Sequence, residues 1–376
     1  MRLLVVGAGI SGLTVAALLR RGGHDVVLID RRSGDADAGY ALALWPHGTR
    51  VFHALGIHDE FIARAEPMGA YVMSDGDGVP LVESAMPAAV TDRGFVGVID
   101  RGEMTSLLEQ AAGEIRRGVT VEGFSETAAD VQVRLDDGTS DTFDAVIGAD
   151  GMHSRVRELL LGRIDEFDTG WGCHVWWADR NIAGTETTER MGAGTFLGTY
   201  PCRDRVCVIL GGAASDLLPD QPTGRSDRIA GRLQPFGVPV EEFCADLPAD
   251  DQDLFWWRMA DVRSPRWTRG RIGLVGDAAT GFLPTAGIGA SMALESAAAL
   301  ADELSRTDAA HVQHALALYE KRRRQRVESV QTQSRWLARM MFLEQPALVR
   351  ARNVVARRMS IGQALGGLIK LLDEPI

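Results

Sequence analysis

The stretch RLLVVGAGISGLTVAALLRRGG, which begins at residue 2, is the feature that most constrains the fold. Its apolar residues 2–6 predict a short buried strand, and the Ala/Leu-rich part after the glycines predicts a helix. Gly7, Gly9 and Gly12 match the spacing G-x-G-x-x-G. In a strand-turn-helix unit, the first glycine allows the tight turn, the second lets backbone approach a pyrophosphate, and the third lets helix pack on strand. The sequence therefore predicts a Rossmann-like α/β domain that binds a dinucleotide.

The residues next to this loop fit the same interpretation. Ile10 and Ser11 open the predicted helix, whose free N–H groups and partial positive charge favour phosphate. A second predicted strand, HDVVLID, ends at Asp30, where an acidic side chain can accept a ribose hydroxyl. Arg31 follows directly, and either contacts the adenosine half of the ligand or is solvated. The alternative for the whole unit is a glycine turn in an α/β protein that binds no nucleotide.

Composition excludes several classes of function. The chain has 376 residues, 45% of them hydrophobic, and a formal net charge of -11, which disfavours nucleic acid as a partner. Its four cysteines show neither a CxxC pair nor zinc-like spacing, so we expect buried thiols, no metal site and a cytoplasmic location. No run of about 18 apolar residues occurs, so we expect no membrane span.

Two later segments extend the pattern. Residues 119–149 alternate as strands do and lead into the apolar run FDAVIGAD, whose last residue, Asp150, opens the segment DGMHSRVRELL. Residues 168–260 contain turn-punctuated strands, and we expect an antiparallel sheet there. The segment GRIGLVGDAATGFLPTAGIGASMALE predicts a strand at 271–275, an irregular loop and a long helix from about Gly289.

Together, the glycine loop, the DG segment at Asp150 and the GD segment at Asp277 resemble the motifs of the class A FAD-dependent aromatic hydroxylases, the para-hydroxybenzoate hydroxylase-like flavoproteins. The resemblance covers about residues 1–335. It implies an α/β fold, α+β in the substrate part, with a Rossmann-like FAD-binding domain, an interleaved antiparallel-sheet substrate domain and C-terminal helices. The expected boundaries are 1–70, 93–165 and 262–305 for the discontinuous FAD-binding domain, 71–92 and 166–261 for the substrate domain, and 306–376 for the helical region.

The resemblance also implies contacts with FAD. Asp277 is expected to hydrogen-bond the ribityl chain, and Arg101 to contact the cofactor, although a plain helix-start arginine is the alternative. The isoalloxazine is expected near four residues of one short segment: Pro284, Gly287, Ile288 and Gly289. A helix N-terminus there would favour the negative charge of reduced flavin. Family members commonly have His where this chain has Thr280 and Gln where it has Ile288, so details of substrate orientation do not transfer.

The reaction implied by the resemblance is hydroxylation of an aromatic or polycyclic small molecule. NADH or NADPH would reduce FAD, and O2 would then form a flavin C4a-hydroperoxide that delivers oxygen. Two alternatives stay open: a flavin-dependent reductase or oxidase on the same scaffold, and a non-catalytic flavin-binding sensor or sequestering protein.

Candidate substrate-side residues follow from composition and position. We expect the pocket to be lined by Trp176, Trp257, Phe282 and Pro284, with plain sheet core as the alternative for each tryptophan. His47 and His174 are candidates for acid or base catalysis.

The basic run at 320–329 is expected to be a solvated helix face, with an oligomer contact or attraction of the NADPH phosphate as alternatives. The helices after it pack on the body of the chain or on a partner subunit, which leaves a homo-oligomer open.

Overall fold

A six-stranded, largely parallel sheet carries the first glycine loop. The computed structural model describes residues 1–34, 39–182, 184–217, 224–248 and 254–374. The sheet has the order β18-β19-β12-β1-β2-β8. Its strands are β1 (Arg2–Val6), β2 (Asp25–Asp30), β8 (Arg116–Arg117), β12 (Ala145–Gly148), β18 (Thr268–Arg269) and β19 (Ile272–Leu274). Val6, at the end of β1, is paired in parallel with Ile29 and Gly148. The strands predicted at 2–6 and 271–275 therefore belong to one sheet, with β12 between them.

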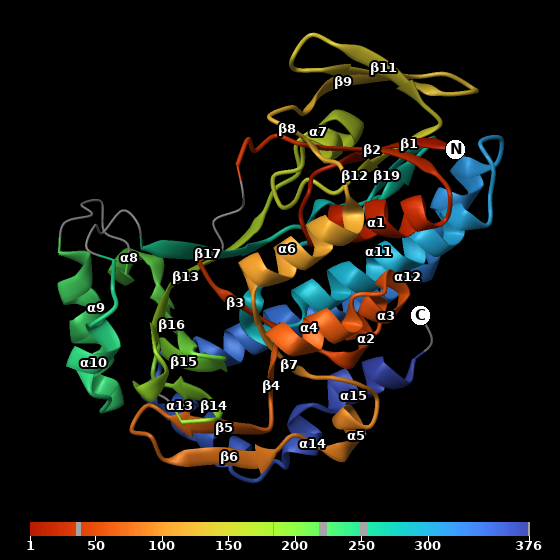
Figure 1. Cartoon of the computed structure of the whole chain (residues 1–376). Helices are drawn as coiled ribbons and strands as arrows, with labels where there is room; N and C mark the ends of the chain where they lie inside the picture. The colour runs from red at the N-terminus through yellow and green to blue at the C-terminus, as the bar shows by residue number, and fades with distance from the viewer. Residues whose placement is uncertain (35–38, 183, 218–223, 249–253, 375–376) are drawn as a thin grey trace.

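Helices cover this sheet and bring the two glycine stretches together. The helix α1 (Ile10–Arg21) packs against α6 (Arg101–Ala112) and α11 (Gly289–Ser305), as Figure 1 shows. Close approach requires glycine at Gly12, because a Cβ there would lie 1.8 Å from the carbonyl oxygen of Gly7. The predicted α/β class and the Rossmann-like strand-turn-helix unit are confirmed.

A second, seven-stranded sheet has the order β17-β13-β16-β15-β14-β5-β6 and is antiparallel except where β14 pairs in parallel with β5. Its strands are β5 (Ala70–Asp75), β6 (Pro80–Ala85), β13 (Phe167–Asp179), β14 (Thr187–Met191), β15 (Thr195–Cys202), β16 (Arg205–Ala213) and β17 (Phe255–Asp261). One face packs on the short helices α8 (Ala214–Leu217), α9 (Arg225–Leu233) and α10 (Val240–Cys244). Figure 1 shows α9 and α10 on the side of this sheet away from α1 and α11. The opposite face is therefore available to form a site.

Two three-stranded sheets and several short helices complete the body of the molecule. One sheet contains β9 (Val121–Glu126), β10 (Val131–Leu135) and β11 (Ser140–Phe143), and the other contains β3 (Ala41–Leu44), β4 (Glu66–Pro67) and β7 (Gly97–Asp100). Strands β3, β4 and β7 run between the two larger sheets (Figure 1). The short helices are α2 (Pro46–Thr49), α3 (Val51–Leu55), α4 (His58–Arg64), α5 (Ala88–Thr91) and α7 (Arg155–Leu161).

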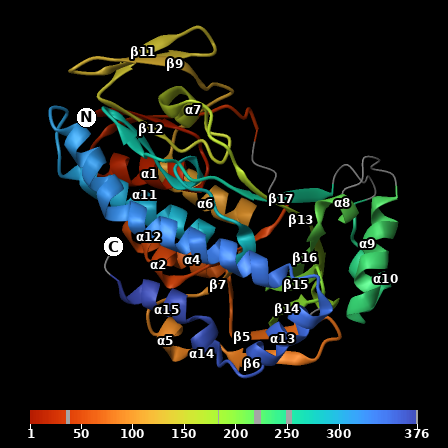
Figure 2. The same ribbon diagram turned by 180° about the vertical axis from the view of Figure 1, so that it is seen from behind.

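The C-terminal helices cross the back of the molecule. They are α12 (Val312–Met341), α13 (Pro346–Ala356), α14 (Ile361–Ala364) and α15 (Gly366–Asp373). Figure 2 shows α12 extending from the region of the six-stranded sheet to that of the seven-stranded sheet. Within the described residues, no helix combines the length and apolar character needed to cross a bilayer.

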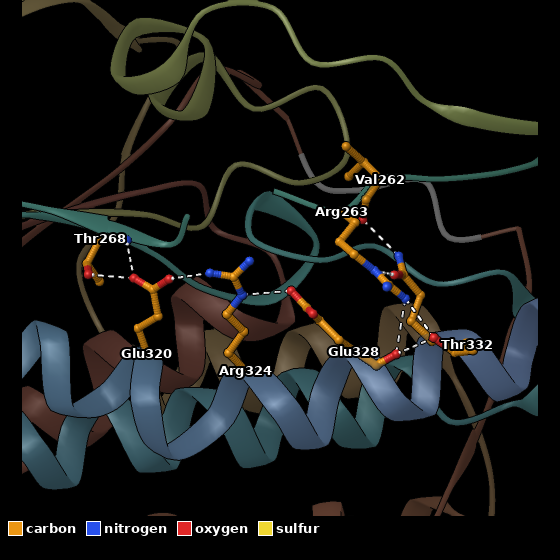
Figure 3. A network of polar contacts seen from close by, with 8 residues as sticks. Val262, Arg263, Thr268, Glu320, Arg324, Glu328 and Thr332 are labelled. Carbon is orange, nitrogen blue, oxygen red and sulfur yellow. Dashed lines mark hydrogen bonds and ion pairs between the residues drawn. The ribbon is translucent and has the colours of Figure 1, made fainter. Parts of the chain in front are cut away.

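Polar contacts fix α12 to β18 and to the loop that precedes it (Figure 3). Glu320 accepts hydrogen bonds from the Thr268 backbone N–H at 2.9 Å and hydroxyl at 2.7 Å. Arg324 bridges Glu320 and Glu328, one helical turn to either side. Arg324 thus holds Glu320, the residue that connects α12 to β18.

The expectation that the basic run at 320–329 is a solvated face is wrong for Arg323. Its side chain is fully buried and pairs with the buried Glu295 of α11 at 2.5 Å. The helix is packed on α11 on one side, so one of three successive arginines must point into the core.

Candidate cofactor and substrate cavity

A cavity of about 1610 Å³ joins the two glycine stretches to the uncovered face of the seven-stranded sheet. Sites for one drug-sized ligand have roughly 300–1,000 Å³. Helices α12, α13 and α15 close part of the cavity with apolar side chains: Leu337, Met340, Leu348, Leu368 and Leu371. The volume is large enough for a dinucleotide cofactor and a second ligand together.

The first glycine stretch forms one end of the cavity. Gly7 has φ +105°, and a Cβ there would lie 2.5 Å from the carbonyl oxygen of Ala149. Gly9 is different, because a Cβ at this position would meet no atom within 4 Å and would enter the cavity. Ile10 and Ser11 also line the cavity, and the first intrahelical bond runs from the N–H of Leu13 to Gly9. The preceding helical N–H groups lack intrahelical partners, so this end is suited to an anion.

Asp30 stands beside this loop at the end of β2. Its carboxylate accepts hydrogen bonds from the N–H groups of Ala8 at 2.6 Å and Arg32 at 2.8 Å. It lines the cavity while holding the glycine turn against β2. Arg31 is exposed at the cavity margin.

Asp277 lies where the second glycine stretch meets the first. The short 3-10 helix η3 (Gly276–Ala278) begins at Gly276, and a Cβ there would lie 2.0 Å from Ser11 Oγ. The side chain of Asp277 is exposed to the cavity but enclosed by protein on its other sides. Burial raises the pKa of Asp277 to about 6, and the positive charges of Arg101 and Arg157 oppose the rise. A carboxylate open to the cavity and close to an arginine is suited to accept hydroxyl donors.

The remaining part of the second stretch forms a turn and a helix N-terminus at the cavity wall. Pro284 begins the 3-10 helix η4 (Pro284–Ala286), Gly287 follows with φ +57°, and α11 begins at Gly289. Trp45 donates from its indole nitrogen to the carbonyl of Gly287 at 3.1 Å, which fixes the turn. The first turn of α11 contains no acidic residue. The partial positive charge of this helix end is therefore available to a ligand.

Arg101 and Asp150 complete the set of predicted cofactor-binding residues. Arg101 lines the cavity, with its guanidinium 5.2 Å from the ring centre of Tyr40. Asp150 also lines the cavity, and its carboxylate accepts from the N–H groups of Arg155 at 2.6 Å and Val156 at 3.1 Å. Burial raises the pKa of Asp150, which these hydrogen bonds oppose. Asp150 thus organises the start of α7 next to the cavity.

The predicted substrate-pocket residues divide into two groups. Trp257, Phe282 and Pro284 line the cavity. Trp176 does not: it is 3% exposed and donates from its indole nitrogen to the carbonyl of Phe243 at 2.9 Å, beneath α10. Neighbouring residues of a strand point to opposite faces, and on β13 the cavity face belongs to Cys173. The placement of Trp176 in the pocket is corrected accordingly.

Neither predicted histidine lines the cavity. His174 shares the face of Trp176, is fully buried, and its Nε2 lies 3.0 Å from the carbonyl oxygen of Leu217. His47 is also fully buried, and neither ring nitrogen has a hydrogen-bond partner among the described residues. Burial lowers the pKa of His47 to about 4, so its imidazole is neutral near pH 7. The structure therefore removes both residues as acid or base candidates.

Sequence reasoning missed the polar group on the sheet face, formed by Tyr71, Glu189 and Tyr200. The available indication was strand alternation: in TTERM, residues 187, 189 and 191 point to one face. Nothing in the sequence showed that this face borders the cavity.

Comparison with known proteins identifies the class. A model of a family described as an FAD binding domain matches residues 1–183 and 242–334. The chain is 30% identical to 3-amino-4-hydroxybenzoate 2-monooxygenase PtnB3 of Streptomyces platensis over 349 residues, covering 89% of this chain and 87% of the relative. It is 27% identical to 2-heptyl-3-hydroxy-4(1H)-quinolone synthase of Pseudomonas aeruginosa, covering 95% and 94%. HpxO of Klebsiella pneumoniae, solved with FAD and uric acid, has the same fold with a TM-score of 0.91, at 23% identity and coverage of 99% and 96%.

The fold and the cavity thus define an FAD-binding flavoprotein of the class A hydroxylase type. The chain belongs to the family of FAD-dependent aromatic monooxygenases, and FAD is its cofactor. The described residues contain no group of three or more His, Cys, Asp or Glu side chains placed to hold a metal ion.

Proposed function

We propose that the protein hydroxylates an aromatic or polycyclic small molecule bound against the open face of the seven-stranded sheet. The observation that carries this proposal is one cavity that continues from the glycine stretches to an apolar sheet wall. Met73, Phe196, Trp257 and Met259 contribute to that wall. A planar apolar molecule would bury its surface there beside the cofactor. The relatives named for aminohydroxybenzoate and quinolone chemistry support an aromatic substrate.

The chain's residues have separate roles in the proposed reaction. When bound, FAD would supply the redox chemistry that links a nicotinamide reductant, NADH or NADPH, to the activation of O2. We assign the pyrophosphate to Gly7, Gly9 and the α1 N-terminus, which Gly12 allows to pack closely on the glycine turn. The adenosine ribose is assigned to Asp30 and the ribityl chain to Asp277. The α11 N-terminus at Gly289 would stabilise negative charge beside it.

The other predicted contacts are assigned by position. Arg31 would lie at the adenosine margin, whereas Arg101 and Asp150 would border the middle of the cofactor. Trp257, Phe282 and Pro284 would cover the reacting carbon and exclude water, which protects the reactive form of the cofactor. Gly287 and Ile288 would form the adjoining backbone.

We further propose that the chain divides into the FAD-binding, substrate and helical regions expected from its sequence, because each large sheet has its own hydrophobic cluster. The four cysteines are free thiols, which supports the cytoplasm as the proposed location. A homo-oligomer stays a prediction that sedimentation analysis would test.

The proposal is tested by measuring NAD(P)H oxidation with a panel of phenols, indoles and polycyclic aromatics, with peroxide and products measured in parallel. We expect at least one ligand to accelerate oxidation and to yield a stoichiometric hydroxylated product. Reduction or dehydrogenation of a ligand without hydroxylation would favour the reductase or oxidase alternative. Bound FAD without accelerated oxidation by any ligand would favour the sensor alternative.

A further inference from the structure

Three polar side chains meet on the cavity face of the seven-stranded sheet. Tyr200 of β15 donates its phenolic proton to Glu189 Oε1 at 2.7 Å, and Tyr71 of β5 donates to Glu189 Oε2. Glu189 lies on β14, which is hydrogen-bonded to both of the other strands. All three side chains line the cavity. We call them the Tyr-Glu-Tyr cluster.

The backbone of the sheet is shaped to form this cluster. Thr187 is paired with Tyr71, whereas Gly198 of β15 stands opposite Glu189. A Cβ on Gly198 would lie 2.6 Å from the ring of Tyr200 and 2.9 Å from its hydroxyl. Glycine at this position therefore leaves the space through which Tyr200 reaches the carboxylate.

The surroundings of Glu189 contain no paired cation. Apolar side chains lie beside it on the same wall, among them Met73 and Met191. Arg352 also lines the cavity, but its guanidinium donates to the backbone carbonyls of Met191 at 2.8 Å and Met340 at 3.2 Å. Among the described residues, Glu189 forms no ion pair; burial raises its pKa, and the hydrogen bonds from Tyr71 and Tyr200 oppose the rise. Two phenols therefore satisfy part of the hydrogen-bonding capacity of Glu189 in place of a counter-ion, and a carboxyl group with a shifted pKa at a cavity wall is a candidate for ligand binding.

The hydrogen-bonding capacity of the cluster defines which ligand it fits. Both phenolic protons are donated to the carboxylate, so neither is free for a ligand. What the cluster offers to the cavity is acceptors: the remaining lone pairs of Glu189 and of the two phenolic oxygens. An ionised Glu189 adds one negative charge. Hydrogen-bond donors are therefore favoured, and an anionic group is repelled.

We propose that the Tyr-Glu-Tyr cluster binds the hydrogen-bond-donating polar end of the aromatic substrate and selects against a carboxylate at that end. The fitting groups are a phenolic hydroxyl, an aryl amine or a ring N–H. The cluster is thus the specificity-determining part of the substrate wall, and Tyr71, Glu189 and Tyr200 bind and orient the ligand. This inference rests on the proposed function, because it places the substrate on the same wall.

The test uses FAD-loaded protein and three ligands with one apolar body: naphthol, methoxynaphthalene and naphthoate, each substituted at the same ring position. Dissociation constants are measured by calorimetry without NAD(P)H. We expect naphthol to bind at least about tenfold more tightly than methoxynaphthalene, since a hydrogen bond to a charged group typically contributes that much. Naphthoate is expected to bind most weakly. Equal affinities, tightest binding of naphthoate, or no binding of any of the three would overturn the proposal.

Variants locate the preference. Glu189→Gln keeps the shape but supplies an amide donor, so we expect the preference for naphthol to fall at least about fivefold and naphthoate to gain affinity. Tyr71→Phe and Tyr200→Phe should each have a smaller effect in the same direction. Glu83→Gln on β6 makes the same chemical change in the same sheet at an exposed side chain outside the cavity, so it is the control and should leave the order unchanged. If Glu189→Gln retains its FAD and its melting temperature but also the wild-type order, the cluster does not set specificity.

This result is separable from the proposed function. Ligand selectivity without any hydroxylated product would overturn the hydroxylase proposal and leave the cluster as a recognition site. Formation of a hydroxylated product together with unchanged ligand selectivity in Glu189→Gln would overturn the role of the cluster and leave the hydroxylase proposal standing.

Discussion

The two ends of the cavity are built from different parts of the chain. At the end proposed for FAD, the walls are largely backbone: Gly7, Gly9 and the first turns of α1 and α11. At the sheet end, the walls are side chains that alternate along strands, such as Glu189 and Trp257. A backbone that binds a cofactor can keep its shape when the sequence changes, whereas the side chains of a substrate wall can be exchanged one by one. The difference explains how one scaffold keeps its cofactor while its ligand varies.

The largest expected effect separates the two faces of the seven-stranded sheet. Trp176→Ala should lower the free energy of unfolding by about 3–5 kcal/mol, because a buried tryptophan is replaced by a cavity. Trp257→Ala removes a side chain that borders the cavity, so it should cost less stability but divert NAD(P)H oxidation toward peroxide. Denaturant unfolding and peroxide assays of both variants measure the contrast. Equal losses of stability would show that the two faces are not distinct.

The second largest effect is expected at the glycine-rich end of the cavity, where FAD is proposed to bind. Gly9→Val should lower FAD affinity on the order of 100-fold, about 2.7 kcal/mol, because its side chain would enter the open cavity without clashing with protein. The FAD-free protein should unfold at the same temperature as the wild type. Gly69→Val is the matched control, since Gly69 is exposed, its Cβ would also meet nothing within 4 Å, and it lies outside the cavity. Wild-type FAD affinity in Gly9→Val would show that the pyrophosphate does not bind next to Gly9.

Asp277 should show opposite effects on binding and stability. Its pKa is raised to about 6 from an ordinary 3.8, so the folded protein holds a proton that the unfolded chain releases between these values. Stability of the FAD-free protein is therefore reduced as pH rises through this range, and Asp277→Asn removes the loss. We expect the variant to bind FAD about tenfold more weakly. The melting temperature of FAD-free Asp277→Asn, relative to wild type, should be higher at pH 8 than at pH 4.

The smallest effect on activity is expected for His47. Its pKa is lowered to about 4 by burial, below the ordinary 6.5, so the unfolded chain takes up a proton that the folded protein excludes. Stability is consequently lost as pH falls from about 6.5 to about 4, and His47→Leu should abolish that part of the acid sensitivity. The dependence of kcat on pH between 6 and 8 should be unchanged. A shifted profile in that range would restore His47 as a participant in catalysis.

The comparison of the two ends also explains what could be predicted from sequence. The glycine spacing and the apolar strand 2–6 identified the Rossmann-like unit, because only a few backbone conformations satisfy them. The three-motif resemblance led to FAD and to Asp277. Trp176 and His174 were misplaced because alternation shows which residues share a face but not which face borders the cavity. Tyr71 and Glu189 lie far apart in sequence and meet through the parallel pairing of β5 with β14, which no local pattern encodes.

The central claim is that one cavity holds FAD at its backbone end and an aromatic substrate at its sheet end, close enough for oxygen transfer. Incubation with isotopically labelled O2, NAD(P)H and the ligand that most accelerates NAD(P)H oxidation tests it directly. The account predicts a product with one labelled oxygen for each NAD(P)H consumed. Accelerated NAD(P)H oxidation with all label recovered in peroxide and water, and none in any ligand of the panel, would contradict it.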